Sequence, residues 1–89
     1  EEVGRLLLVV EILSPGSARA DRIVKRNLYQ REAVLEYWIV DVDARLIERW
    51  RPDDDRPEVL AERLTWAPGG AAEPFRLDLP AFFEAIVGP

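Results

Sequence analysis

The sequence contains no cysteine, no histidine and no methionine, and it holds a single lysine, Lys25. The absence of cysteine excludes a disulfide framework, a thiolate metal site and a cysteine nucleophile. The absence of histidine excludes the Ser-His-Asp triad, histidine-based zinc sites and the usual general base. Any catalysis must therefore depend on carboxylates, hydroxyls, Lys25, or a hard metal ion such as Mg²⁺ bound through oxygen.

Long hydrophobic runs are also missing, because no stretch approaches the roughly 20 apolar residues that a membrane-spanning helix requires. The first apolar run follows two glutamates rather than a basic segment, so no secretory signal is visible. The net charge of -5 disfavours nonspecific binding of nucleic acid by the chain as a whole. These features predict a cytoplasmic protein with no membrane partner, and 89 residues allow one small domain.

Residues 6–15 are the most apolar stretch of the chain, and they lack the alternation of a solvated strand. Such a run is typical of a strand that is buried on both faces. Glu11 is the one charged residue within it, and an ionised carboxylate without a partner costs several kcal/mol in such surroundings. We therefore expect Glu11 to be neutralised, paired with a cation or bound to a metal ion.

A helix is predicted over residues 18–32, with Val24 and Leu28 spaced to face the core and with Ile23 and Tyr29 beside them. Between Arg19 and Arg31 the local charge balance is +4, because five basic residues stand against one aspartate. The basic residues are Arg19, Arg22, Lys25, Arg26 and Arg31. Charge alone favours a solvated helix face.

The rest of the chain predicts antiparallel strands and a short terminal helix. Residues 36–41 are rich in aromatic and β-branched residues and predict a strand, and residues 45–50 predict its hairpin partner. Residues 58–64 alternate as a third, outer strand, and residues 75–79 form a short extended piece. Pro80 is expected to open the terminal helix. The residues expected to dock this helix are Phe82, Phe83 and Ile86.

Lys25 is unusual because the other eleven basic residues are all arginines. A compact ammonium can approach a phosphate or a water molecule where a guanidinium would not fit. A purely structural role also remains open for Lys25, Glu11 and Tyr29. Lys25 follows Asp21 at the spacing of an exposed helical ion pair, Glu11 could pair with an arginine, and Tyr29 could be an ordinary core residue.

Three motifs together carry a resemblance to a known family. They are the run from Val9 to Pro15 with Glu11 at its centre, the helical set Asp21, Lys25 and Tyr29, and the strand Glu36-Tyr37-Trp38-Ile39-Val40-Asp41. In this order and spacing they resemble the C-terminal half of the Uma-two family. Members of that family are described as putative restriction endonucleases of the PD-(D/E)xK nuclease superfamily.

The resemblance implies an α+β, partial restriction-endonuclease-like core over residues 1–89, with metal-dependent hydrolysis of DNA as the activity. In the superfamily, an aspartate and a glutamate on neighbouring strands hold Mg²⁺, and a lysine positions or activates the attacking water. The resemblance therefore implies that Glu11 is a ligand for Mg²⁺ or Mn²⁺ and that Glu11 and Lys25 are catalytic. The superfamily's usual lysine position is taken by Leu13, and Lys25 on the helix replaces it.

Two departures from the family pattern leave alternatives open. The family's N-terminal half, with its metal-binding aspartate, is absent, and Leu6-Leu7 replaces the Pro-Asp that commonly opens the first strand. We therefore expect a truncated nuclease domain with an incomplete site. One alternative is an inactive remnant that serves as a structural or protein-interaction module. The exposed sheet edge of such a module is expected to pair with another chain, including a second copy, to form a homo-oligomer. Another alternative is that a neighbouring polypeptide supplies the missing half and completes the site.

Overall fold

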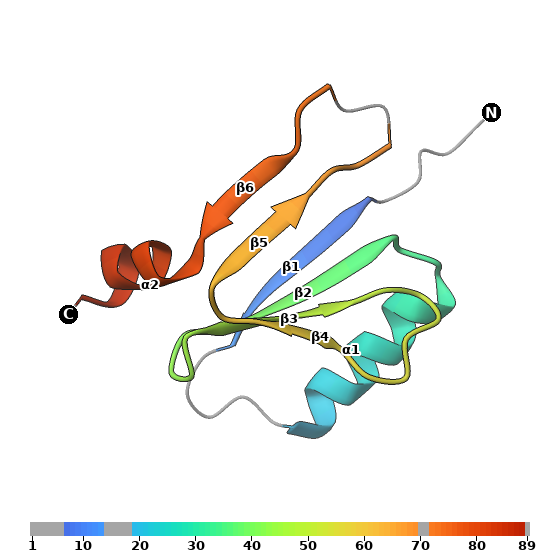
Figure 1. Ribbon diagram of the computed structural model, residues 1–89. Helices are drawn as coiled ribbons and strands as arrows, with labels where there is room; N and C mark the ends of the chain where they lie inside the picture. The colour runs from blue at the N-terminus through green and yellow to red at the C-terminus, as the bar shows by residue number, and fades with distance from the viewer. Residues whose placement is uncertain (1–6, 14–18, 70–71, 89) are drawn as a thin grey trace.

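The computed structural model describes residues 7–13, 19–69 and 72–88, with the side chains of residues 19–22 outside that description. The predicted α+β class and the predicted order of elements are confirmed (Figure 1). The elements are β1 (Leu8–Leu13), α1 (Arg19–Arg31), β2 (Glu36–Asp41), β3 (Leu46–Trp50), β4 (Glu58–Leu60), β5 (Arg63–Trp66), β6 (Phe75–Asp78) and α2 (Leu79–Val87).

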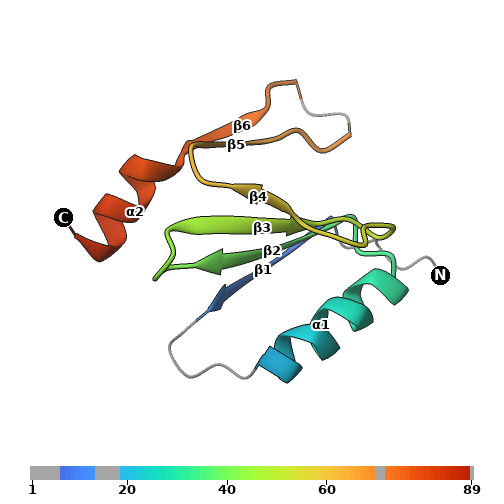
Figure 2. The same ribbon diagram turned by 60° about the horizontal axis from the view of Figure 1, so that its bottom comes forward.

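The elements form layers on the two faces of a four-stranded sheet. The strand order is β1-β2-β3-β4, with β1 parallel to β2 and the other pairs antiparallel. Two parallel neighbours need a crossover connection, which α1 provides. Figure 2 shows α1 on one face of this sheet and the β5-β6 pair with α2 on the other. In the described part of the chain, neither helix has the length and hydropathy needed to span a membrane.

β2 is the strand around which the core is built. Its four central residues, Tyr37, Trp38, Ile39 and Val40, are all buried. Tyr37 and Ile39 pack toward α1, whereas Trp38 and Val40 pack toward the β5-β6 layer. A strand that is covered on both faces needs no polar alternation, which explains its continuous apolar run.

β1 forms as a strand within residues 6–15, but the expectation that it is buried on both faces is wrong. Val10 and Ile12 are 48% and 67% exposed. β1 lies at the edge of the sheet, and β2 is its only strand partner among the described residues. Val10 and Ile12 lie on the β5-β6 side of the sheet, where that layer does not cover them. A run of aliphatic residues shows that a segment is hydrophobic. Whether the segment is buried depends on which other strands and layers pack against it, and these come from distant parts of the sequence.

The predicted orientation of α1 is also wrong, although its position in the sequence is confirmed. Ile23, Val24 and Leu28 are exposed rather than turned toward the core. Tyr29, which was predicted beside them, does pack against the buried cluster that includes Tyr37, so this part of the prediction is confirmed. The side of α1 that faces the sheet is therefore the one that carries polar and aromatic residues.

The single outer strand predicted over residues 58–64 is two strands in different sheets. β4 ends at Leu60 and pairs with β3, whereas β5 begins at Arg63 and pairs with β6. At the crossing point the amide of Leu79 donates a hydrogen bond to the carbonyl of Glu62 at 3.0 Å. The alternation of side-chain types continues between Leu60 and Arg63. The sequence pattern alone therefore could not show that the chain passes from one sheet to the other there.

α2 begins at Leu79 with the proline in its first turn, as predicted. The Asp78 side chain caps the helix by accepting a hydrogen bond at 3.1 Å from the amide three residues on. Phe83 is fully buried and Phe82 is partly buried, as expected for the docking face. Ile86 is 53% exposed, so its predicted docking role is wrong, and Leu79 is the buried residue in its place.

Arg49 is a buried cation that connects the two sheets. Its Nη1 donates to the carbonyl of Thr65 on β5 at 2.8 Å, and its Nε donates to Glu58 on β4 at 3.0 Å. The Glu36 carboxylate lies 3.7 Å from Nη1. Two carboxylates and a carbonyl thus compensate a charge that would otherwise be costly to bury.

Candidate active site

Glu11 and Lys25, the two predicted site residues, are brought together by the fold. Glu11 lies in register with Ile39 on the face of the sheet that α1 covers. The Nζ atom of Lys25 donates a hydrogen bond to Oε1 of Glu11, and the two form an ion pair. Their side chains are 38% and 29% exposed, so solvent and a substrate can reach both. Of the three outcomes expected for Glu11, the structure shows pairing with a cation, and the catalytic role of the pair stays a prediction.

The packing of Tyr29 explains why Lys25 faces Glu11. Residues four apart on a helix lie on the same side, one turn above the other. The ring of Tyr29 packs on the ring of Tyr37, with the two centroids 4.8 Å apart and the planes tilted by 55°. This contact fixes the rotation of α1 and turns Lys25, one turn earlier, toward the sheet.

Arg26 is a second cation on the sheet-facing side of α1. Its guanidinium carbon lies 4.6 Å from the centroid of the Trp50 ring, within the range of a cation–π interaction. The sequence pattern places Arg26 only among the charges of a solvated helix face. Its contact with a strand of the sheet depends on helix rotation, which periodicity did not predict.

Glu48 is a further carboxylate on the same face as Glu11. The strand register aligns Glu11, Ile39 and Glu48 in one row across β1, β2 and β3. Two strand spacings separate the two carboxylate-bearing residues by roughly 10 Å at the Cα level. Glu48 also accepts a hydrogen bond from Nε1 of Trp50 at 3.3 Å. The alternation of a strand places Glu48 on the same face as Trp50, but only the pairing of strands reveals that Glu11 shares this face.

The site offers the type of ligand that a hard metal ion prefers, but too few of these ligands. Carboxylate oxygens are the ligands that Mg²⁺ prefers, and Glu11 offers one carboxylate. Across the residues that the structure describes, no group of three or more aspartate, glutamate, histidine or cysteine residues could hold a metal ion. One copy of the described chain therefore does not by itself provide a full set of metal ligands.

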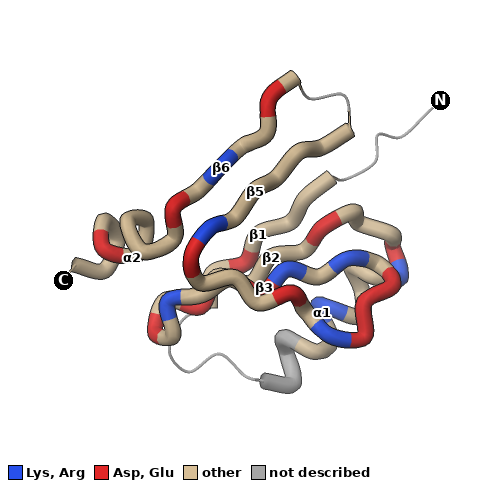
Figure 3. Tube along the Cα trace, viewed as in Figure 1, with Lys and Arg blue, Asp and Glu red and all other residues tan. Residues whose placement is uncertain are grey.

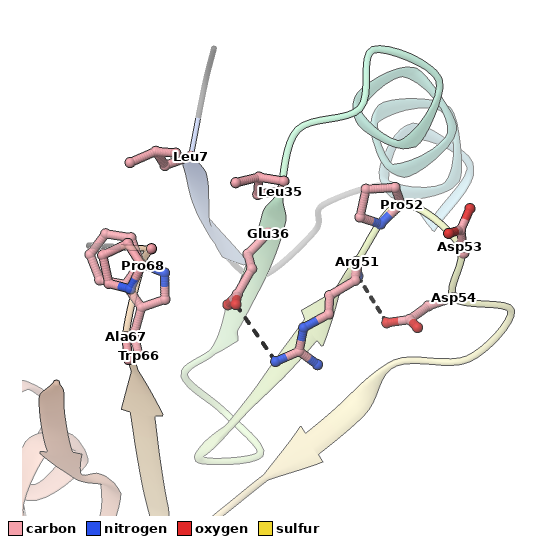
Figure 4. Close-up of a pocket in the computed structure, with 11 residues that line it drawn as sticks. Leu7, Leu35, Glu36, Arg51, Pro52, Asp53, Asp54, Trp66, Ala67 and Pro68 are labelled. Carbon is pink, nitrogen blue, oxygen red and sulfur yellow. Dashed lines mark hydrogen bonds and ion pairs between the residues drawn. The ribbon is translucent and has the colours of Figure 1, made fainter. Parts of the chain in front are cut away.

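A separate pocket of 490 Å³ opens where β2 begins (Figure 4). It is lined by Leu7 and by residues 35–36, 51–54 and 66–69. Glu36 and Arg51 form an ion pair in it at 3.6 Å. Glu36 is in register with Leu8, so it lies on the opposite face of the sheet from Glu11. This pocket is therefore not part of the Glu11–Lys25 site.

Comparisons with known proteins agree on a nuclease-like fold. No curated protein matches the chain. Among solved structures, the chain is similar to a protein from Anabaena variabilis ATCC 29413 described as a putative nuclease belonging to DUF820. The two share 25% sequence identity and superpose with a TM-score of 0.70. The similarity covers 92% of this chain and 46% of that chain, so this chain spans about half the length of that protein.

The family comparison covers most of the sequence. Residues 3–79 match the Uma2 family, which is described as putative restriction endonuclease. The matched residues include Glu11, Lys25 and the strand β2, which is paired with β1. The chain belongs to the Uma2 family.

Proposed function

We propose that this chain is part of a metal-dependent nuclease domain that hydrolyses phosphodiester bonds of DNA, with Glu11 and Lys25 as its catalytic residues and with an incomplete metal site among the described residues. The observation that carries the proposal is their ion pair, which joins residues 14 positions apart within the part of the chain that matches Uma2. Mg²⁺ or Mn²⁺ is the expected cofactor, because the family resembles nucleases that use such ions. The cytoplasm is the expected location.

In this proposal Lys25 acts as a point charge beside the reacting phosphate. An ammonium that is held in place can offset the charge that develops on a phosphoryl group. Glu11 holds this ammonium by accepting its hydrogen bond, and the partial exposure of both side chains leaves room for a phosphate. Glu11 would also be a ligand for the divalent ion, which when bound polarises the phosphate and supplies hydroxide near neutral pH.

The basic residues of α1 would position the DNA backbone near the pair. Arginine and lysine bind nucleic acid largely by neutralising phosphates. Arg26 is adjacent to Lys25 on α1, and its contact with Trp50 holds its guanidinium near the sheet. Local charge on α1 therefore matters more for DNA than the negative charge of the whole chain.

A second candidate function is that of a protein-interaction module. The observation that favours it is the edge strand β1, on which Val10 and Ile12 are exposed. An exposed apolar edge is a template for pairing with another chain. Such a module would bind a partner without cleaving DNA.

Cleavage of supercoiled plasmid DNA tests the nuclease proposal. We expect cleavage in Mg²⁺ or Mn²⁺ but not in a chelator, and at least about a 100-fold lower rate in Glu11→Gln. Glu48→Gln is the matched control, because it removes a carboxylate on the same face two strands away. Cleavage at equal rates by wild type and Glu11→Gln, or no cleavage at any metal concentration, would reject the proposal for this chain.

A further inference from the structure

Beside the row of Lys25 and Tyr29, α1 carries a second row of residues that contact the sheet. Arg26 and Gln30 are four residues apart, so they lie on the same side of the helix. Each residue turns an α-helix by about 100°, so this row is rotated by about 100° from the first one. Arg26 lies over the ring of Trp50, the last residue of β3, and Gln30 contacts the turn that follows this strand. Two rows of α1 are therefore held by different strands.

The turn after β3 offers two carbonyl groups to Gln30. The Nε2 atom of Gln30 donates to the carbonyl of Arg51 at 3.0 Å and to the carbonyl of Asp54 at 2.8 Å. The turn is closed by its own hydrogen bonds. The amide of Asp54 donates to the carbonyl of Arg51 at 3.1 Å, and the amide of Arg51 donates to the Asp54 carboxylate at 2.8 Å (Figure 4). Pro52 occupies the second position of the turn, where its fixed φ stiffens the chain. Gln30 therefore ties α1 to a stiff extension of β3.

This contact requires a hydrogen-bond donor on the side chain of Gln30. Both of its partners are carbonyl oxygens, and only the amide nitrogen of the side chain can donate to them. The bond to Asp54 is partly buried, so water does not fully replace it when it is lost. A glutamate has the same length and shape, but its ionised carboxylate only accepts hydrogen bonds. Gln30→Glu therefore breaks the contact with little change in volume.

We propose that Gln30 is a positioning residue for Lys25, and its effect on catalysis rests on the proposed function. A helix that is held along one row only can roll about its axis. Tyr29 provides the contact of one row and Gln30 that of the other, so together they fix the roll of α1. The roll decides whether the ammonium of Lys25 reaches Glu11. A displacement of about 1 Å can lower the rate of a reaction about 100-fold, so a small roll is enough to matter.

The surroundings of Lys25 can be measured directly, because it is the only lysine of the chain. Isotope-labelled lysine gives a single Cε signal in a proton–carbon correlation spectrum, and Glu11→Gln calibrates how this signal moves when the ion pair is lost. We expect Gln30→Glu and Gln30→Met, neither of which has a donor, to move the signal in the same direction. A signal that stays at the wild-type position in either folded Gln30 variant would overturn the inference, and circular dichroism checks the folding of each variant.

Asn27→Asp is the matched control, because it makes the same change from amide to carboxylate on the same helix. Asn27 is exposed and accepts a hydrogen bond at 3.3 Å from the neighbouring Arg26. Charged residues of both signs gather at α1, at β3 and in the loop after β3 (Figure 3), so a new negative charge there also acts through space. We expect Asn27→Asp to leave the Lys25 signal near its wild-type position. Equal movements in Asn27→Asp and Gln30→Glu would overturn the inference.

Plasmid cleavage in Mg²⁺ or Mn²⁺ tests whether this position of Lys25 matters for the reaction. We expect both Gln30 variants to lower kcat at least about tenfold and to leave KM within about twofold, because the ammonium is displaced while the residues that bind DNA are unchanged. A wild type that cleaves DNA, with Gln30 variants that cleave it equally fast, rejects the inference alone. A wild type that cleaves no DNA rejects the nuclease proposal, and the Lys25 signal then decides whether Gln30 positions Lys25.

Discussion

At the scale of single residues, Glu11 shows how a carboxylate persists in an apolar strand. It accepts a hydrogen bond from Lys25, and its side chain is still 29% exposed. Among the residues that the structure describes, β1 has a strand neighbour on one side only, so the cost of desolvating this carboxylate is smaller than in a strand that is covered on both faces. The apolar neighbours of Glu11 in the sequence drew attention to it, but its position at the sheet edge keeps it accessible.

Glu58 predicts a pH dependence of stability. The hydrogen bond from Arg49 holds the pKa of Glu58 below its ordinary value of 4.5, against an opposing effect of burial, and Arg51 lowers the pKa further. A carboxylate with a lowered folded-state pKa stabilises the fold above its ordinary pKa, and this contribution is lost as the pH falls through the folded-state pKa. Wild type should therefore be more stable than Glu58→Gln at neutral pH, and the two should converge below pH 4.5.

Urea unfolding of both proteins across this pH range measures the effect. The difference should be small, because the Glu58 side chain is 46% exposed and solvent screens its pairs. Glu73→Gln, a substitution of another exposed carboxylate, is the control and should follow the wild-type curve. A gap between wild type and Glu58→Gln that stays constant with pH would contradict this assignment.

At the scale of elements, the sequence predicted positions better than orientations. β2 occupies the predicted residues, and α1 lies within its predicted range. Helical periodicity predicted that Val24 and Leu28 face the core, because these residues are apolar. The sheet face under α1 presents Glu11 and aromatic rings instead, and these favour the side of α1 that carries Lys25 and Tyr29. The side of α1 that faces inward therefore depends on the sheet surface beneath it, and the sequence of the helix alone does not reveal that surface.

The rotation of α2 leads to a test of its docking. Phe83 is fully buried, whereas Ile86 is 53% exposed. Phe83→Ala should lower the free energy of unfolding by about 3–5 kcal/mol, because it leaves a cavity among buried side chains. Ile86→Ala, the matched truncation three residues later, should cost about 1 kcal/mol or less. Urea unfolding followed by tryptophan fluorescence measures both, and equal losses would show that α2 docks in another rotation.

At the scale of the whole molecule, the features that the sequence did not predict are those that depend on contacts between residues far apart in the chain. The division of residues 58–64 between two sheets and the exposure of β1 both depend on pairing between distant segments. The meeting of Glu11 and Lys25 was implied by the family resemblance and not by residue spacing alone. The parallel β1-α1-β2 unit accounts for it, since the crossover helix lies over the strand that it follows.

A double-mutant cycle on plasmid cleavage tests most directly whether Glu11 and Lys25 form one hydrolytic site. In Mg²⁺ or Mn²⁺, Glu11→Gln and Lys25→Met should each lower the rate at least about 100-fold. The double variant should be no slower than the slower single variant, because residues that act as a unit are not additive. Each variant should lose less than about 1 kcal/mol of stability, since the pair is partly exposed. Effects that multiply, or single variants that cleave DNA at the wild-type rate, would contradict a shared site.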